Sequence, residues 1–264
     1  MRAAQLRAWN ALDLGPAWQA RDPGAGDAAE AGAVGGTDAE QPPGVVDTGE
    51  PPPVGDRVAS LDWPALRAAV ADCRACGLSR TRTQTVFGVG DERARWMLVG
   101  EAPGAEEDAR GEPFVGQAGR LLDNMLATIS LARGRDVFIA NVLKCRPPGN
   151  RNPEPEEVAC CEPFLRRQVE LVAPRVVLVM GRFAAQSLLR TDASIASLRG
   201  RVHRYAAGER EVPVVVTYHP AYLLRNLGDK AKAWADLCLA RRVLQDAIAE
   251  DGPSRGPETR TDGP

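Results

Sequence analysis

Four short apolar runs stand out in the middle of the chain, at residues 96–100, 137–142, 176–181 and 214–218. Each is rich in valine, leucine, isoleucine or methionine and is bounded by polar or turn-forming residues. Continuous apolar runs of this length are typical of parallel strands that are buried on both faces of a sheet. We therefore predict four buried strands between residues 60 and 250.

Segments with helical spacing of apolar residues separate and follow these runs, at 119–129, 155–172, 183–189 and 234–248. The second segment opens with Pro-Glu-Glu, which is a favourable first helical turn. Strands that alternate with helices predict a three-layer α/β/α sandwich around a four-stranded, mostly parallel sheet. In such folds ligands bind beyond the carboxyl ends of the strands, so the chemistry is expected there.

The composition changes on both sides of this region. Residues 1–59 hold 4 basic and 9 acidic side chains and are rich in Pro, Gly and Ala, a composition that buries too little apolar surface to offset its ordering entropy. We predict a disordered N-terminal extension at 1–59, one folded domain at 60–250 and a disordered tail at 251–264. The extension is a candidate contact for a replication or repair protein.

Net charge and hydropathy narrow the choice of partners. The chain has a net charge of −2, yet residues 60–250 alone carry +4, nearly all of the basic residues being arginine. Arginine suits bidentate phosphate contact, so the balance permits a nucleic-acid ligand. The sequence shows neither a run of about 18–20 apolar residues nor a secretory leader. We therefore expect a cytoplasmic, nucleoid-associated monomer with no membrane partner.

The predicted strand ends carry the residues with chemical potential. The first strand runs into Gly-Glu101-Ala-Pro-Gly, the second ends at Asn141, the fourth is followed by His219-Pro, and Phe114 lies in a Gly-Pro-rich loop. Separately, each has a structural alternative: a helix cap, a turn residue, a satisfied histidine or a core aromatic. Together, a carboxylate, an amide, an imidazole and an aromatic ring can hold a planar heterocycle and stabilise charge on it.

The cysteines predict a metal centre. Cys73 and Cys76 form a C-x2-C pair, Cys145 follows after 68 residues, and Cys161 after another 15. Four thiolates suit either tetrahedral zinc or a [4Fe-4S] cluster, and the spacing leaves both open. Cys160, next to Cys161, is an alternative fourth ligand.

Several motifs, in the same order, resemble those of the iron-sulfur, family 4 uracil-DNA glycosylases. They are Gly-Glu-Ala-Pro-Gly, Pro-Phe-Val-Gly, Asn-Val-Leu-Lys-Cys-Arg-Pro-Pro and His-Pro-Ala-Tyr-Leu-Leu-Arg, and the resemblance covers about residues 61–247. It implies an α/β/α glycosylase fold, a [4Fe-4S] cluster as cofactor, and hydrolytic release of uracil from uracil-containing DNA. The cluster ligands that it implies are Cys73, Cys76, Cys145 and Cys161.

The resemblance also implies roles for the other motif residues. As catalytic residues, His219 donates a hydrogen bond to uracil O2, and Glu101 orients or deprotonates the attacking water beside the sugar. The implied uracil-binding residues are Ala102, Glu107, Phe114 and Asn141. The implied DNA-binding residues are Lys144, Arg146, Arg151, Leu223 and Arg225. Leu223, with Tyr222 and Leu224, is a candidate for the wedge that enters the duplex.

Two other functions compete with turnover. A related protein class captures uracil-DNA covalently through a histidine inserted near the second motif. This chain has only His203 and His219, neither of them between Cys145 and Cys161, so turnover is favoured. The second competitor is a metal-stabilised DNA-binding module that associates with a polymerase through the N-terminal extension.

Overall fold

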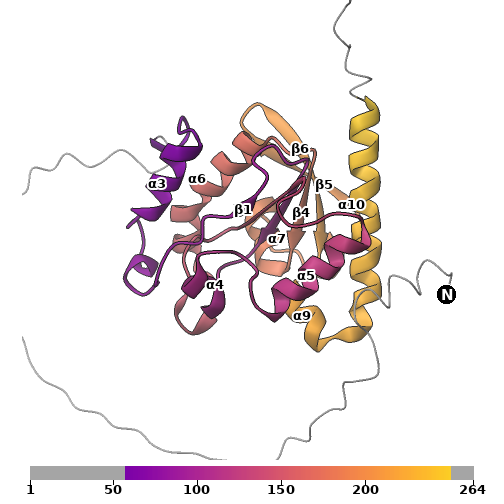
Figure 1. Cartoon of the computed structure of the whole chain (residues 1–264). Helices are drawn as coiled ribbons and strands as arrows, with labels where there is room; N and C mark the ends of the chain where they lie inside the picture. Colours follow the sequence, from indigo (N-terminus) through magenta and orange to yellow (C-terminus); the bar gives the residue numbers. More distant parts are fainter. Residues whose placement is uncertain (1–56, 251–264) are drawn as a thin grey trace, which may run out of the picture.

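The computed structural model describes residues 57–250 (Figure 1). The predicted tail and all but the last three residues of the predicted N-terminal extension lie outside the described residues. None of the helices within 57–250 is long and apolar enough to cross a membrane.

A mixed sheet forms the centre of the described part. Its six strands follow the order β1-β3-β2-β4-β6-β5, and β3, β2, β4 and β6 are mutually parallel. The strands are β1 (Val89–Gly90), β2 (Trp96–Gly100), β3 (Val137–Asn141), β4 (Val176–Met180), β5 (Val202–Ala207) and β6 (Arg210–Thr217). The predicted α/β fold class is confirmed, and the four predicted parallel strands form the centre of this sheet.

The two antiparallel edge strands, β1 and β5, were not predicted. β1 has two residues, too few to leave a pattern, and β5 mostly alternates exposed and half-buried positions instead of forming an apolar run. The number of strands was therefore wrong, because the apolar-run criterion detects only strands that are covered on both faces.

Alternate residues of each central strand enter two separate cores. In β2, Met97 and Val99 pack into one core, whereas Trp96 and Leu98 pack into the other. The whole of β2 is buried, which explains the unbroken apolar run in the sequence.

Helices cover both faces of the sheet (Figure 1). One core receives side chains from α3 (Trp63–Ala71), α6 (Pro155–Val172), α7 (Arg182–Leu189) and α8 (Ile195–Leu198). The other core receives side chains from α5 (Gln117–Thr128), α9 (Pro220–Arg225) and α10 (Lys230–Glu250). Predicted helix 155–172 is confirmed residue for residue, whereas the short helices α3, α4 (Ala105–Arg110), α8 and α9 were not predicted.

The loop before α5 is held by unusually close backbone packing. A Cβ atom on Gly119 would lie 1.7 Å from the carbonyl oxygen of Phe114, so only glycine fits there. Phe114 itself has a left-handed backbone with φ 56°. Arg133 adds two donors, Nη1 to the carbonyl of Pro113 and Nη2 to that of Phe114, both at 2.8 Å. These contacts hold the backbone of Phe114 in place and thereby position its ring.

Replacing Gly119 with alanine should force α5 and the Phe114 segment apart. We expect G119A to lower the free energy of unfolding by about 1–3 kcal/mol, as overpacking typically does. Urea denaturation followed by circular dichroism measures the change. The matched control is G228A, whose added Cβ meets nothing within 4 Å. Equal stability of the two variants would contradict the close packing.

Candidate active site and thiol cavity

A cavity of about 840 Å³ opens at the carboxyl ends of the central strands. All the predicted catalytic and uracil-binding residues line it: Glu101, Ala102, Glu107, Phe114, Asn141 and His219. Glu101 follows β2, Asn141 ends β3 and His219 follows β6. The structure therefore brings these side chains together, although their separate roles stay predictions.

Tight packing around Gly100 brings two of these side chains close to the backbone. A Cβ on Gly100 would lie 2.4 Å from Asn141 Oδ1 and 2.6 Å from Phe114 Cζ. The Phe114 ring stacks on the imidazole of His219, with centroids 5.4 Å apart and an interplanar angle of 28°. An amide, an aromatic face and an imidazole thus share one wall of the cavity.

His219 is held as a neutral hydrogen-bond donor. It is the N-cap of α9, and its Nδ1 accepts the backbone N–H of Ala221 at 3.1 Å. Because Nδ1 is an acceptor, the ring proton of the neutral imidazole is on Nε2. Burial lowers the pKa of His219 to about 4, so the ring is uncharged at neutral pH. Nε2–H is the donor available to a ligand.

Two carboxylates of the cavity have different surroundings. Burial raises the pKa of Glu101, against an opposing effect of the positive charge on Arg182. The oxygens of Glu107, by contrast, accept the backbone N–H groups of Gly104 and Val115, at 3.1 and 3.0 Å. Glu107 therefore orders the two loops that meet at the cavity, whereas Glu101 offers a free carboxylate.

Three arginines line the same cavity: Arg151, Arg182 and Arg225. Arg225 is exposed, and Arg151 pairs with the carboxylate of Glu157. Arg146 is half-buried, with its Nε bonded to Asn150 Oδ1 at 2.7 Å. DNA contact stays a prediction for Arg146, Arg151 and Arg225. Arg182 was not predicted as a DNA-binding residue, but it lines the same cavity as Arg151 and Arg225 and is a further candidate for DNA contact.

The DNA-binding prediction for Lys144 is wrong. Its side chain is only 1% exposed, and its Nζ donates to the carbonyl of Asn141 and to Gln168 Oε1, both at 2.7 Å. A buried ammonium with both bonds directed inwards cannot reach a phosphate. Lys144 instead ties the end of β3 to α6.

The wedge prediction for Leu223 is also wrong. Leu223 is 1% exposed and packs into the core beneath α9, whereas its neighbour Leu224 is 37% exposed. Successive residues of a helix point about 100° apart, so one of two adjacent leucines faces the core and the other faces solvent. Leu224 is the candidate that remains.

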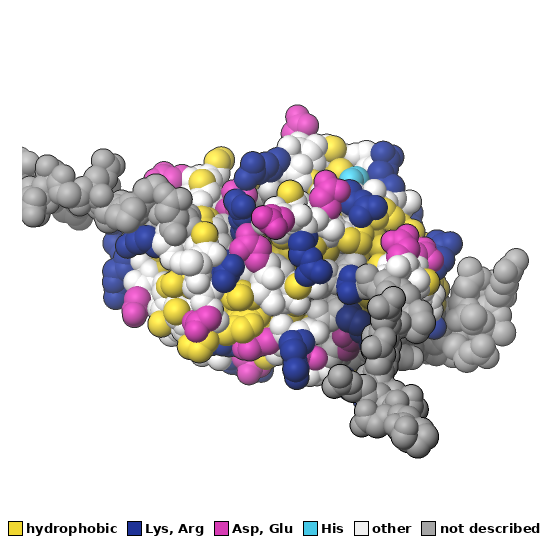
Figure 2. All heavy atoms as spheres, turned by 90° about the horizontal axis from the view of Figure 1, so that it is seen from above, with side chains coloured by type: hydrophobic (Ala, Val, Ile, Leu, Met, Phe, Trp, Pro, Cys, Tyr) yellow, Lys and Arg dark blue, Asp and Glu magenta, His cyan; other side chains and the backbone are white. Residues whose placement is uncertain are grey.

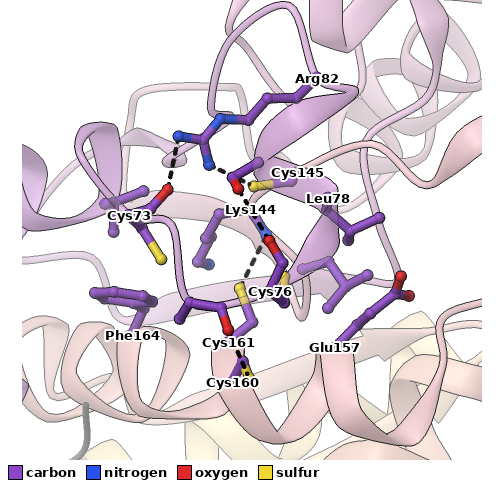
Figure 3. A pocket seen from close by; sticks show the side chains of 14 residues that line it. Cys73, Cys76, Leu78, Arg82, Lys144, Cys145, Glu157, Cys160, Cys161 and Phe164 are labelled. Atoms are coloured by element: carbon purple, nitrogen blue, oxygen red, sulfur yellow. Dashed lines mark hydrogen bonds between the residues drawn. The ribbon is translucent and has the colours of Figure 1, made fainter. Parts of the chain in front are cut away.

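A second cavity is lined by the four predicted ligands Cys73, Cys76, Cys145 and Cys161, and also by Cys160 (Figure 3). Two nitrogens donate directly to sulfur: Arg82 Nη1 to Cys145 at 2.9 Å and the Lys144 backbone N–H to Cys161 at 3.2 Å. Arg82 also binds the carbonyl of Cys73 at 2.9 Å. These hydrogen bonds connect the segments that carry Cys73, Cys145 and Cys161 around the second cavity.

Burial affects the acid–base properties of three of these thiols. It raises the pKa of Cys76, Cys145 and Cys161, that of Cys161 to about 12. Cys161 is buried, while Cys160 is half-exposed and donates to the carbonyl of Ala75 at 3.4 Å. Within residues 57–250, no three His, Cys, Asp or Glu side chains are arranged to hold a single metal ion.

The opposite end of the molecule differs in charge. Figure 2 views the end that carries the β5–β6 hairpin and the last turn of α10, and it shows basic and acidic side chains interspersed. A groove of about 710 Å³ there is lined by Arg204 and Arg210 as well as by Glu170, Glu209 and Glu211. Acidic side chains outnumber basic ones along this groove, whereas three arginines and two glutamates line the catalytic cavity, so a phosphate backbone is better matched to the catalytic cavity.

Comparison with known proteins agrees with this geometry. The family model of the uracil DNA glycosylase superfamily matches residues 87–238. A type-4 uracil-DNA glycosylase of Archaeoglobus fulgidus is 48% identical over 59% of this chain and 79% of its own length. Those of Thermotoga maritima and Pyrobaculum aerophilum are 42% and 38% identical, over 67% and 68% of this chain and 86% and 93% of their own lengths. The chain therefore belongs to the uracil-DNA glycosylase superfamily and, within it, to the type-4 enzymes.

Proposed function

We propose that this protein removes uracil from DNA by hydrolysing its N-glycosidic bond, which leaves an abasic site for base excision repair. The observation that carries the proposal is the meeting of Glu101, Phe114, Asn141 and His219 in one cavity. The names of the type-4 relatives support the same activity.

The cavity suits a base that has left the duplex. Enzymes that act on a base inside DNA must rotate the nucleotide out of the stack to reach it. The Phe114 ring offers a stacking surface, and the Asn141 amide can donate to uracil O4 and accept from N3–H. Cytosine reverses this donor and acceptor pattern, so Asn141 would favour uracil over cytosine.

The chemical step depends on His219 and Glu101. The C1′–N1 bond breaks with its electron pair going to uracil, which leaves as an anion. Nε2–H of the neutral His219 donates to O2, where negative charge develops. The oxygen of a water molecule forms the new bond to C1′, and its proton passes to the Glu101 carboxylate. The carboxylate charge also favours a positively charged sugar in the transition state.

The thiol cavity suits a [4Fe-4S] cluster. Cys73, Cys76, Cys145 and Cys161 would hold it, and two N–H donors already point at their sulfurs. Four thiolates suit either one zinc ion or a [4Fe-4S] cluster, and the resemblance to the iron-sulfur, family 4 glycosylases favours the cluster. When bound, the cluster would be structural, because four thiolates leave no position open for substrate. It would fix the cysteine segments beside Asn141.

The mouth of the catalytic cavity suits the DNA backbone. Arg151, Arg182 and Arg225 would contact phosphates, and Leu224 would fill the gap that the extruded base leaves. His203 does not line the catalytic cavity, and its Nε2 lies 2.7 Å from the carbonyl oxygen of Leu198. This placement favours turnover over covalent capture. We further propose that the protein acts as a monomer near the nucleoid, with residues 1–59 available to a repair or replication partner.

His219→Ala should slow uracil excision by roughly two to three orders of magnitude, because the donor to O2 is lost. Single-turnover assays on a uracil-containing oligonucleotide and a matched thymine-containing one measure the rate and the specificity. His203→Ala is the control and should keep the wild-type rate. Full activity of H219A would refute the proposed anion stabilisation.

Asn141→Asp should weaken the preference for uracil over cytosine by at least about tenfold, because a carboxylate cannot donate to O4. Excision from oligonucleotides that contain uracil, cytosine or thymine measures the preference. Asn150→Asp, at the rim of the same cavity, is the matched control. An unchanged ranking of the three bases in N141D would rule out a reading role for Asn141.

Cys161→Ser should abolish the broad absorbance near ~400 nm that an iron-sulfur cluster gives to brown protein. Cys160→Ser should keep the absorbance, since Cys160 bonds to a backbone carbonyl and is half-exposed. Iron and zinc analysis of both purified variants and the wild type completes the test. A colourless wild-type protein with one bound zinc would contradict the cluster.

A further inference from the structure

The turn that carries His219 rests on a stack of side chains that the proposed reaction does not use. Tyr218 and Tyr222, on either side of His219, stack with their ring centroids 4.8 Å apart and an interplanar angle of 22°. The guanidinium carbon of Arg199 lies 4.3 Å from the centroid of the Tyr218 ring. Arg199 does not itself line the catalytic cavity, but both tyrosines do.

An ion pair anchors one end of this stack, and a hydrogen bond anchors the other. Nε and Nη2 of Arg199 each lie 2.7 Å from Asp236 Oδ2. The Asp236 side chain, on α10, is 1% exposed, and that of Arg199 is 10% exposed. At the other end, the Tyr222 hydroxyl donates to Asp229 Oδ2 at 2.6 Å. The turn is therefore held between α10 and the segment that follows α9.

The chemistry of this stack requires arginine in particular. A planar guanidinium can lie over an aromatic ring and, at the same time, donate in its own plane to a carboxylate. A lysine ammonium could pair with Asp236 but could not stack in this way. Burying an ion pair has a large desolvation cost, and its net gain in stability over apolar residues is commonly small. A positioning role accounts for such a pair beneath a catalytic turn.

We propose that Arg199 is a positioning residue for His219, acting through Tyr218. The Asp236–Arg199–Tyr218 contacts hold the turn so that His219 Nδ1 keeps the Ala221 N–H and Nε2–H points into the cavity. Loss of the guanidinium lets the turn relax, so that the Nδ1–H form of the ring becomes populated. The inference rests on the proposed function only for its effect on the rate of excision.

The test compares R199M, R199K and Y218L in the full chain. Y218L removes the stacked ring but leaves the Arg199–Asp236 pair in place. R190M is the matched control, because it removes an exposed arginine that pairs with Glu162. The measurements are kcat and KM for excision of uracil from an oligonucleotide, and the ¹⁵N resonances of the imidazole rings. The chain has two histidines, so His219 is assigned by comparison with H203N.

We expect R199M and Y218L to lower kcat by about tenfold to a hundredfold with KM within about twofold, the usual scale for a misplaced catalytic group. Their His219 resonances should change from one Nε2–H form to a mixture of the two neutral forms. R199K should show the same change in smaller degree. R190M should match the wild type in both measurements.

Wild-type kcat and an unchanged His219 spectrum in folded R199M would overturn the proposal. If R199M does not fold, Y218L and R199K decide by the same two measurements. Failure of the proposed function is distinguishable, since it would appear as no excision of uracil by the wild type. The imidazole spectra would still compare the tautomer of His219 with and without Arg199.

Discussion

Parallel pairing of β3, β2, β4 and β6 is the constraint on which the rest of the molecule depends. Residues from distant parts of the sequence meet only because these strands lie side by side and end at the same edge. Asn141 ends β3, while Glu101 follows the neighbouring β2. Burial of both faces stabilises this register, because a shift by one residue would exchange the side chains of the two cores. The geometry of the site is therefore set by the hydrophobic core.

The catalytic and thiol cavities are physically connected. Asn141 and Cys145 lie on one short segment, and Lys144 between them binds the carbonyl of Asn141 through Nζ and Cys161 through its backbone N–H. Gln168 completes the link, because it accepts from Lys144 and donates to the carbonyl of Phe87. A group bound by the cysteines would thus stiffen the backbone beside the base-reading amide without contacting substrate.

Local patterns were sufficient for the buried strands, the long helices and the identity of the cavity residues. Each strand that is buried on both faces leaves an apolar run, and α6 carries its own start signal in Pro-Glu-Glu. The position of Glu101, Asn141 and His219 at predicted strand ends was sufficient to predict that they meet, and the motif resemblance added the other uracil-binding residues. The edge strand β5 was not predicted, because it mixes exposed and half-buried residues and so leaves no apolar run in the sequence.

The sequence by itself determined the fold class, the family and the set of chemical groups at the site, because these depend on residue type and order. Only the tertiary structure decided which way individual side chains face. Lys144 and Arg146 lie in one motif, and Leu223 and Leu224 lie in another. Lys144 and Leu223 are nevertheless buried, whereas Arg146 and Leu224 are not. Direction depends on packing against other elements, α6 for Lys144 and α5 for the helix that carries Leu223, and no local pattern records it.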